Sequence, residues 1–166
     1  MKLINRDTDY ALKALLAVAR RRPGETGSVS ELSEDLDIPR PYLRKIMQTL
    51  ARSGVVASLK GKNGGFSLAR PPEAIRLAEI LRIFQGDICF RDCLFRDKIC
   101  REFRTCPLLK VLGRLEDRFV KELEAVTLAS LLREEKGARA GVPGRRARRS
   151  SARKGRTVSR NARRSA

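Results

Sequence analysis

Two short amphipathic segments joined by a tight turn lie in the N-terminal third of this chain. Within residues 42–52, apolar side chains recur at spacings of three and four, which places them on one face of a helix. Residues 31–36 show a shorter stripe of the same kind, and Ser30 can cap its first turn. A proline in the intervening segment 37–39 disfavours one continuous helix. The pattern therefore predicts a helix-turn-helix arrangement.

A β-hairpin is predicted directly after the longer helix. Residues 55–59 and 66–69 are β-prone, and the residues between them read Lys-Gly-Lys-Asn-Gly-Gly. Glycine and asparagine accept the positive φ angles that a hairpin loop requires, and the two lysines lie at its tip. A basic hairpin in this position is a wing. We therefore expect a mainly α fold with a small β-hairpin, organised as a winged helix-turn-helix domain.

Further helices are expected on both sides of this unit. Residues 8–22 and 75–85 carry apolar stripes of helical period, and Thr127 can cap a short last helix. After Pro107 an apolar seam repeats at steps of three and four, which is typical of a long dimerisation helix. The seam consists of Leu108, Leu112, Leu115, Phe119, Leu123 and Val126.

Charge is unevenly distributed along the chain. There are 37 Lys+Arg and 19 Asp+Glu, which gives a formal net charge of +18. Residues 137–166 hold 11 of the cations, no acid and no apolar face, so we expect a disordered basic tail. This balance favours a polyanionic partner. Nucleic acid fits better than a membrane surface, because no leucine or aromatic face accompanies the charge.

The predicted elements divide the chain into four regions. They are a winged helix-turn-helix domain over 1–86, a cysteine-bearing loop over 87–106, a dimerisation helix region over 107–136 and the basic tail over 137–166. The chain has no histidine, which excludes His-based catalysis and His-ligated metals. We find no paired-carboxylate site or phosphate loop and expect no enzyme. The polar N-terminus and short apolar runs predict a cytoplasmic protein without a membrane span.

The helix-turn-helix and the basic hairpin together predict a DNA-binding site. The start of a recognition helix enters the major groove, and a basic wing meets the flanking minor groove or the backbone. Here the polar face of residues 40–45 lies opposite the apolar stripe, and it offers cations for guanine edges. The predicted contact residues are Ser30, Arg40, Tyr42, Arg44, Lys45, Lys60, Lys62 and Asn63.

All four cysteines lie close together in the sequence. Cys89, Cys93, Cys100 and Cys106 have the spacing C-x3-C-x6-C-x5-C, which lacks the C-x2-C pairs of most structural zinc sites. Soft thiolates at irregular loop spacing suit an iron–sulfur cluster. From the spacing alone, a thiol/disulfide switch, a zinc site and inert cysteines remain alternatives.

Several motifs occur together and in a fixed order. They are Asp9-Tyr10-Ala11-Leu12, Pro41-Tyr42-Leu43, Gly54-Val55-Val56, Lys60-Gly61-Lys62-Asn63-Gly64-Gly65-Phe66, Cys93/Cys100/Cys106-Pro107 and Thr127-Leu128-Ala129-Ser130-Leu131. With this combination, most of residues 1–132 resembles the IscR and NsrR family of bacterial winged-helix regulators. The resemblance implies a homodimer that binds promoter DNA, commonly as a repressor, and senses iron, nitric oxide, oxygen or redox state.

The resemblance also implies a cofactor and its ligands. An iron–sulfur cluster, [2Fe-2S] or [4Fe-4S], would be held by Cys93, Cys100 and Cys106. Leu109 stands where IscR-type proteins have a histidine, so the fourth ligand would be Asp9, as in NsrR-like proteins, or the local Cys89. Arg44 replaces a glutamate of IscR-type proteins, which favours DNA contact in every state. A cluster-free thiol-switched regulator and a non-specific architectural DNA-binding protein are the alternative functions.

Overall fold

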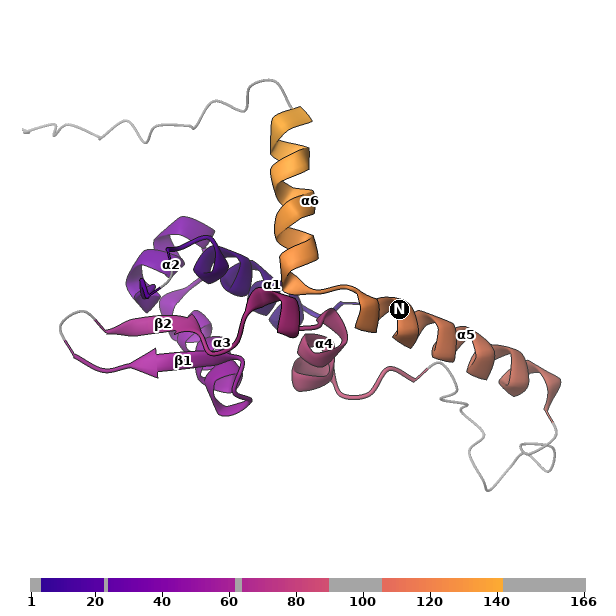
Figure 1. The fold of residues 1–166 in the computed structure, drawn as a ribbon. Helices are drawn as coiled ribbons and strands as arrows, with labels where there is room; N and C mark the ends of the chain where they lie inside the picture. Colours follow the sequence, from indigo (N-terminus) through magenta and orange to yellow (C-terminus); the bar gives the residue numbers. More distant parts are fainter. Residues whose placement is uncertain (1–3, 23, 62–63, 90–105, 142–166) are drawn as a thin grey trace, which may run out of the picture.

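The structure, a computed structural model, describes residues 4–22, 24–61, 64–89 and 106–141 (Figure 1). It confirms the predicted fold class: helices dominate, with one two-stranded antiparallel hairpin. In chain order the elements are α1 (Arg6–Ala19), α2 (Val29–Leu36), α3 (Arg40–Arg52), β1 (Val56–Leu59), β2 (Gly65–Leu68), a short 3-10 turn η1 (Pro72–Ala74), α4 (Leu77–Gln85), α5 (Pro107–Ala125) and α6 (Leu128–Gly141).

The core lies where α1 packs against α3 and α4. Ala11 and Leu15 of α1 and Leu43 and Leu50 of α3 are fully buried, as their helical stripes predicted. The hairpin closes one side of this core through Phe66 of β2. Burial of these apolar faces stabilises α1 and α3, since isolated helices of this length are marginal in water.

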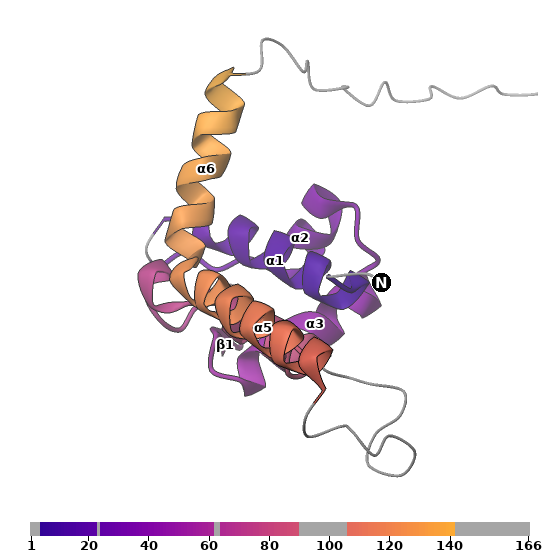
Figure 2. The same cartoon turned by 90° about the vertical axis from the view of Figure 1, so that its right-hand side faces the viewer.

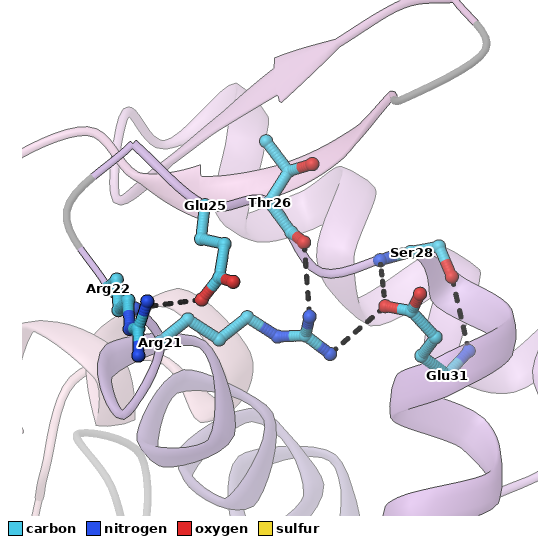
Figure 3. A network of polar contacts seen from close by, with 6 residues as sticks. All are labelled: Arg21, Arg22, Glu25, Thr26, Ser28 and Glu31. Atoms are coloured by element: carbon cyan, nitrogen blue, oxygen red, sulfur yellow. Dashed lines mark hydrogen bonds and ion pairs between the residues drawn. The ribbon is translucent and has the colours of Figure 1, made fainter.

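The loop between α1 and α2 is held by polar contacts that local sequence patterns only partly revealed. Arg21 donates from Nη1 to the carbonyl oxygen of Thr26 at 3.1 Å and forms an ion pair with Glu31 at 3.0 Å (Figure 3). Gly27 pairs with Phe66 through two backbone hydrogen bonds of 2.8 and 2.9 Å. The loop therefore joins the edge of the hairpin to the start of α2.

The N-cap of α2 corrects one prediction. The cap is Ser28 rather than Ser30: Glu31 donates its backbone N–H to the Ser28 hydroxyl at 3.2 Å, and Ser28 donates its own N–H back to the Glu31 carboxylate. This reciprocal pair satisfies two backbone donors, whereas a single cap would satisfy only one. Ser30 instead lies inside the first turn of α2, half-buried.

The first helix is shifted towards the N-terminus relative to the predicted 8–22. Asn5 caps α1 by accepting the backbone N–H of Thr8 at 2.8 Å, so the helix begins at Arg6. It ends at Ala19, and the chain then turns through Gly24, whose φ of +85° is readily adopted only by glycine.

Helices α5 and α6 extend away from the winged domain in different directions (Figures 1 and 2). Two backbone hydrogen bonds tie the junction between them to the start of α4: Leu77 donates to Val126 at 2.9 Å and Leu128 donates to Ile75 at 2.8 Å. Ion pairs join Arg20 to Glu135 and, at 3.0 Å, Arg82 to Glu124. Both helices are therefore fastened to the domain at several points.

Along the first turns of α5 the apolar residues Leu108, Val111 and Leu115 are exposed, and Leu112 of the predicted seam is half-buried. The seam as a dimer contact stays a prediction. One prediction about this region needs correction. Helix α6 continues to Gly141 and so passes residue 137, where disorder was predicted to begin. The predicted tail beyond residue 141 lies outside the described residues. No helix within the described ranges is both long and apolar enough to cross a membrane.

Candidate nucleic-acid interface and cysteine region

The exposed face of α3 carries a row of cationic and polar side chains. Arg40, Arg44, Gln48 and Arg52 follow one another at intervals of four residues, so they lie along one side of the helix. All four are exposed, whereas the opposite face is buried in the core. Lys45 is also exposed and lies beside this row. Arg40, Arg44 and Lys45, three of the predicted DNA contacts, are therefore exposed on this helix, and their contact with DNA stays a prediction.

Gln48 and Arg52 are candidate contact residues that the sequence analysis did not select. The predicted contacts on this helix lie in the first turns of α3, which enter the major groove in most helix-turn-helix proteins. The available signal was the four-residue spacing from Arg40 and Arg44, which continues to the last turn of the helix. The row therefore runs along the whole of α3.

Tyr42 is held on the protein side of this surface. Its hydroxyl donates a hydrogen bond to Oδ1 of Asp7, and its ring meets Tyr10 edge-on with centroids 5.5 Å apart. The hydrogen bond to the Asp7 carboxylate, with burial and the negative charge of Asp7, raises the pKa of Tyr42 above its ordinary value. A DNA contact through this oxygen must therefore compete with Asp7.

The hairpin and α2 supply the remaining predicted contacts. Lys60 is exposed at the end of β1, and Ser30 lies half-buried in the first turn of α2. Lys62 and Asn63 fall outside the described residues. Figure 1 shows the hairpin beside α3, extending beyond the helical part of the domain. One cleft is lined by Arg44, Gln48 and Arg52 of α3 and by Ser58 of β1, so the exposed row on α3 and this strand belong to one surface.

The first turn of α1 is bound to the last turn of α4. Asn5 donates from Nδ2 to the carbonyl oxygen of Phe84 at 3.2 Å, and the fully buried Thr8 donates its hydroxyl to Oε1 of Gln85 at 3.1 Å. The backbone N–H of Asn5 donates to the same Gln85 oxygen at 3.2 Å. These contacts place the start of α1 next to the point where the chain enters the cysteine-bearing segment.

The candidate cluster ligands are only partly described. Cys89 is exposed after α4, and Cys106 is half-buried immediately before α5. Asp9 forms an ion pair with Lys13 at 2.7 Å, and its side chain is 48% exposed. Cys93 and Cys100 lie outside the described residues, and within the described ranges no three Cys, Asp or Glu side chains are arranged to hold a metal ion. Cys89 and Asp9 are compatible with a cluster because both donors are accessible: Cys89 lies in the loop itself, and Asp9 lies in the first turn of α1.

Comparison with known proteins decides the family. The profile of Rrf2, described as an iron-dependent transcriptional regulator, matches residues 4–134. The chain belongs to the Rrf2 family. This confirms the resemblance seen in the sequence, and it identifies a DNA-binding transcription regulator rather than an enzyme.

Solved structures of the same fold include other Rrf2-type regulators. CymR, the global cysteine regulator of B. subtilis, is similar with a TM-score of 0.67 and 22% identity, over 81% of this chain and 98% of that chain. T. potens IscR is similar with a TM-score of 0.65 and 24% identity, over 83% and 90% of the two chains. A transcriptional regulator from Listeria innocua has a TM-score of 0.66 and 25% identity, over 78% and 85%. At these identities the first two show the fold alone.

Proposed function

We propose that this Rrf2 protein is a homodimeric repressor that binds promoter DNA with α3 and the hairpin. The observation that carries the proposal is the uninterrupted exposed row on α3, which presents three arginines and a glutamine beside the basic end of β1. Arginine forms bidentate hydrogen bonds with the edge of guanine, so Arg44 is the proposed base-reading residue, with Lys45 next to it. Arg40, Ser30, Lys60, Lys62 and Asn63 are proposed contacts to the backbone or the flanking groove.

The proposed dimer interface lies on α5. Leu108, Val111 and Leu115 are 63%, 42% and 49% exposed and stand at intervals of three and four residues. These intervals place the three side chains in one stripe along the helix, which a second α5 can cover by knobs-into-holes packing. A two-fold dimer presents two α3 helices to successive major grooves, and the operator is then expected to be palindromic.

The proposed sensor is an iron–sulfur cluster held by Cys93, Cys100 and Cys106, with Asp9 or Cys89 as the fourth ligand. The family description as iron-dependent supports this, as does the clustering of all four cysteines within one segment. A bound cluster would supply the sensing chemistry: it reacts with oxidants or nitric oxide, and its assembly depends on the iron supply. The chain's own part is to provide the thiolates. That of Cys106 lies immediately before α5. The cysteine-bearing segment begins after Gln85, whose side chain accepts a hydrogen bond from Thr8 in the first turn of α1.

A cluster-free thiol switch is the second candidate. It is favoured by the similarity to CymR, which is named a cysteine regulator and is also known from S. aureus in an oxidised form. In that case two of the four cysteines form a disulfide, and the reduced and oxidised forms bind the promoter with different affinity. An architectural, non-specific DNA-binding role differs from both in lacking sequence preference.

Anaerobic purification separates these functions. We expect a coloured protein with stoichiometric iron and sulfide that footprints a discrete promoter site in the presence of excess competitor DNA. Iron-free protein after attempted reconstitution, with a footprint that responds to diamide, supports the thiol switch instead. Protection of all DNA without preference contradicts both regulator functions and leaves the architectural one.

A further inference from the structure

A cleft lies between α3 and the hairpin. It has a volume of about 580 Å3, and its walls are Arg44, Gln48 and Arg52 of α3 and Ser58 and Phe66 of the hairpin. We propose that this cleft holds the sugar–phosphate strand between the major and the minor groove, with the guanidinium of Arg52 bound to a phosphate. The proposal rests on the proposed DNA-binding function and assigns a further part of the same surface.

The charge of the cleft matches this occupant. Two arginines line it together with the polar side chains of Gln48 and Ser58, and none of the described residues that line it carries a carboxylate. Three other surface hollows each include a glutamate: Glu25 in the hollow between α1 and the hairpin, and Glu73 in two hollows beside η1. A concave surface lined by cations without acids concentrates a polyanion, because its walls focus the field.

Arg52 is placed to reach into the cleft from the last turn of α3. Its Nε donates to the carbonyl oxygen of Gln48 at 3.4 Å, which directs the side chain back along the exposed face of the helix. In the part of the chain that the structure describes, its two terminal nitrogens have no carboxylate partner. These nitrogens form the planar pair of donors that fits two phosphate oxygens.

The width of the DNA grooves explains why a strand belongs there. The major groove, about 12 Å wide, admits a helix such as α3, whereas the minor groove, about 6 Å wide, admits only a thinner element such as an extended segment. Adjacent grooves are separated by one sugar–phosphate strand. Elements in the two grooves therefore stand on either side of that strand. The space that it occupies is the cleft between α3 and β1, which pack against each other at the cleft floor.

The test uses the full-length protein, an operator defined by the wild-type footprint, and phosphate-ethylation interference. We expect Arg52→Ala to bind the operator about tenfold more weakly. The slope of the logarithm of the binding constant against the logarithm of the salt concentration (the salt slope) should fall by about one per half-site. One ethylation-sensitive phosphate per half-site, next to the minor groove, becomes insensitive. Arg52→Lys restores part of the affinity. Arg22→Ala, which removes an exposed arginine from the hollow on the other side of the hairpin, leaves all three readouts unchanged.

A second variant tests the cleft without changing a residue of α3, so that its effect cannot come from a loss of α3 structure. Ser58→Glu adds a carboxylate to the cleft from exposed β1 and should weaken binding and abolish the same phosphate contact without touching α3. If Arg52→Ala and Ser58→Glu keep the wild-type salt slope and interference pattern, the cleft does not hold the strand, while the proposed function stands. If the wild-type protein protects no discrete site, the proposed function and the cleft assignment both fail.

Discussion

The hydroxyl of Tyr42 donates a hydrogen bond to Oδ1 of Asp7, which joins the first turn of α3 to the first turn of α1. The same turn of α1 is bonded through Asn5 and Thr8 to the last turn of α4, directly before the cysteine-bearing segment. The start of the recognition helix is thereby connected, through side-chain hydrogen bonds, to the place where the proposed sensor begins. Such a route transmits a signal only if its elements have two arrangements.

Removing the Tyr42 hydroxyl should destabilise the domain. Tyr42→Phe keeps the edge-on contact with Tyr10 but leaves the Asp7 carboxylate without this donor. We expect a loss of about 1 kcal/mol in the free energy of unfolding, measured by urea denaturation. Asp7→Asn is the matched variant, because its amide oxygen still accepts the bond, and it should lose less. Equal stability of wild type and Tyr42→Phe would show that the bond contributes nothing.

The raised pKa of Tyr42 predicts a defined pH dependence. Because the folded state holds Tyr42 protonated beside Asp7, its pKa lies above the ordinary value of about 10. The contribution of this residue to stability is therefore fully present below pH 10, and it is lost as the pH rises from there to the folded pKa. The stability difference between wild type and Tyr42→Phe should be constant from pH 7 to pH 9 and shrink above pH 10. A difference that grows above pH 10 contradicts the assignment.

The capping box of α2 predicts unequal effects at two neighbouring serines. Ser28→Ala removes the acceptor of the Glu31 backbone N–H and should cost about 1 kcal/mol of stability. Ser30→Ala changes a residue inside the first turn and should cost little, since alanine favours a helix. Thermal unfolding of the two variants distinguishes them. A larger loss of stability in Ser30→Ala than in Ser28→Ala would show that Ser30 is the cap.

The exposed stripe on α5 predicts the effect of a charge on assembly. Leu115→Glu should convert the dimer to a monomer, because burying an unpaired carboxylate opposes contact between two apolar stripes. Lys110→Glu, an exposed change on the same helix but outside the stripe, should leave the dimer intact. Light scattering after gel filtration gives the mass of each. A dimeric Leu115→Glu variant would place the interface elsewhere.

Features that depend on neighbouring residues were predictable from the sequence, whereas contacts between distant segments were not. The stripes of α3 and the glycine-rich hairpin loop were predictable because helical period and turn chemistry are local properties. The cap at Ser28 also has a local signal, the Ser-x-x-Glu spacing to Glu31, although Ser30 was the predicted cap. The contact of Tyr42 with Asp7 joins segments 35 residues apart and has no local signature.

Two differences in the C-terminal part have the same origin. Helix α6 passes residue 137 although its composition there favours disorder, and an ion pair between Arg20 of the α1 C-cap and Glu135 holds it against the domain. On α5, the heptad pattern alone did not decide between Leu112 and Val111, because α4 packs against α5 and determines which face is covered. Tertiary packing therefore determined the length of α6 and the exposed face of α5, and the local sequence pattern predicted neither.

In the proposed function, the chemistry of the cysteine region controls DNA binding by α3 and the hairpin. The most direct measurement is a quantitative footprint titration on one promoter fragment, at one salt concentration, with the anaerobically isolated protein and with the same preparation after removal of its iron. We expect protection of the same palindromic site at clearly different protein concentrations, and loss of that difference in Cys106→Ser. Identical titration curves for the two wild-type forms would contradict it.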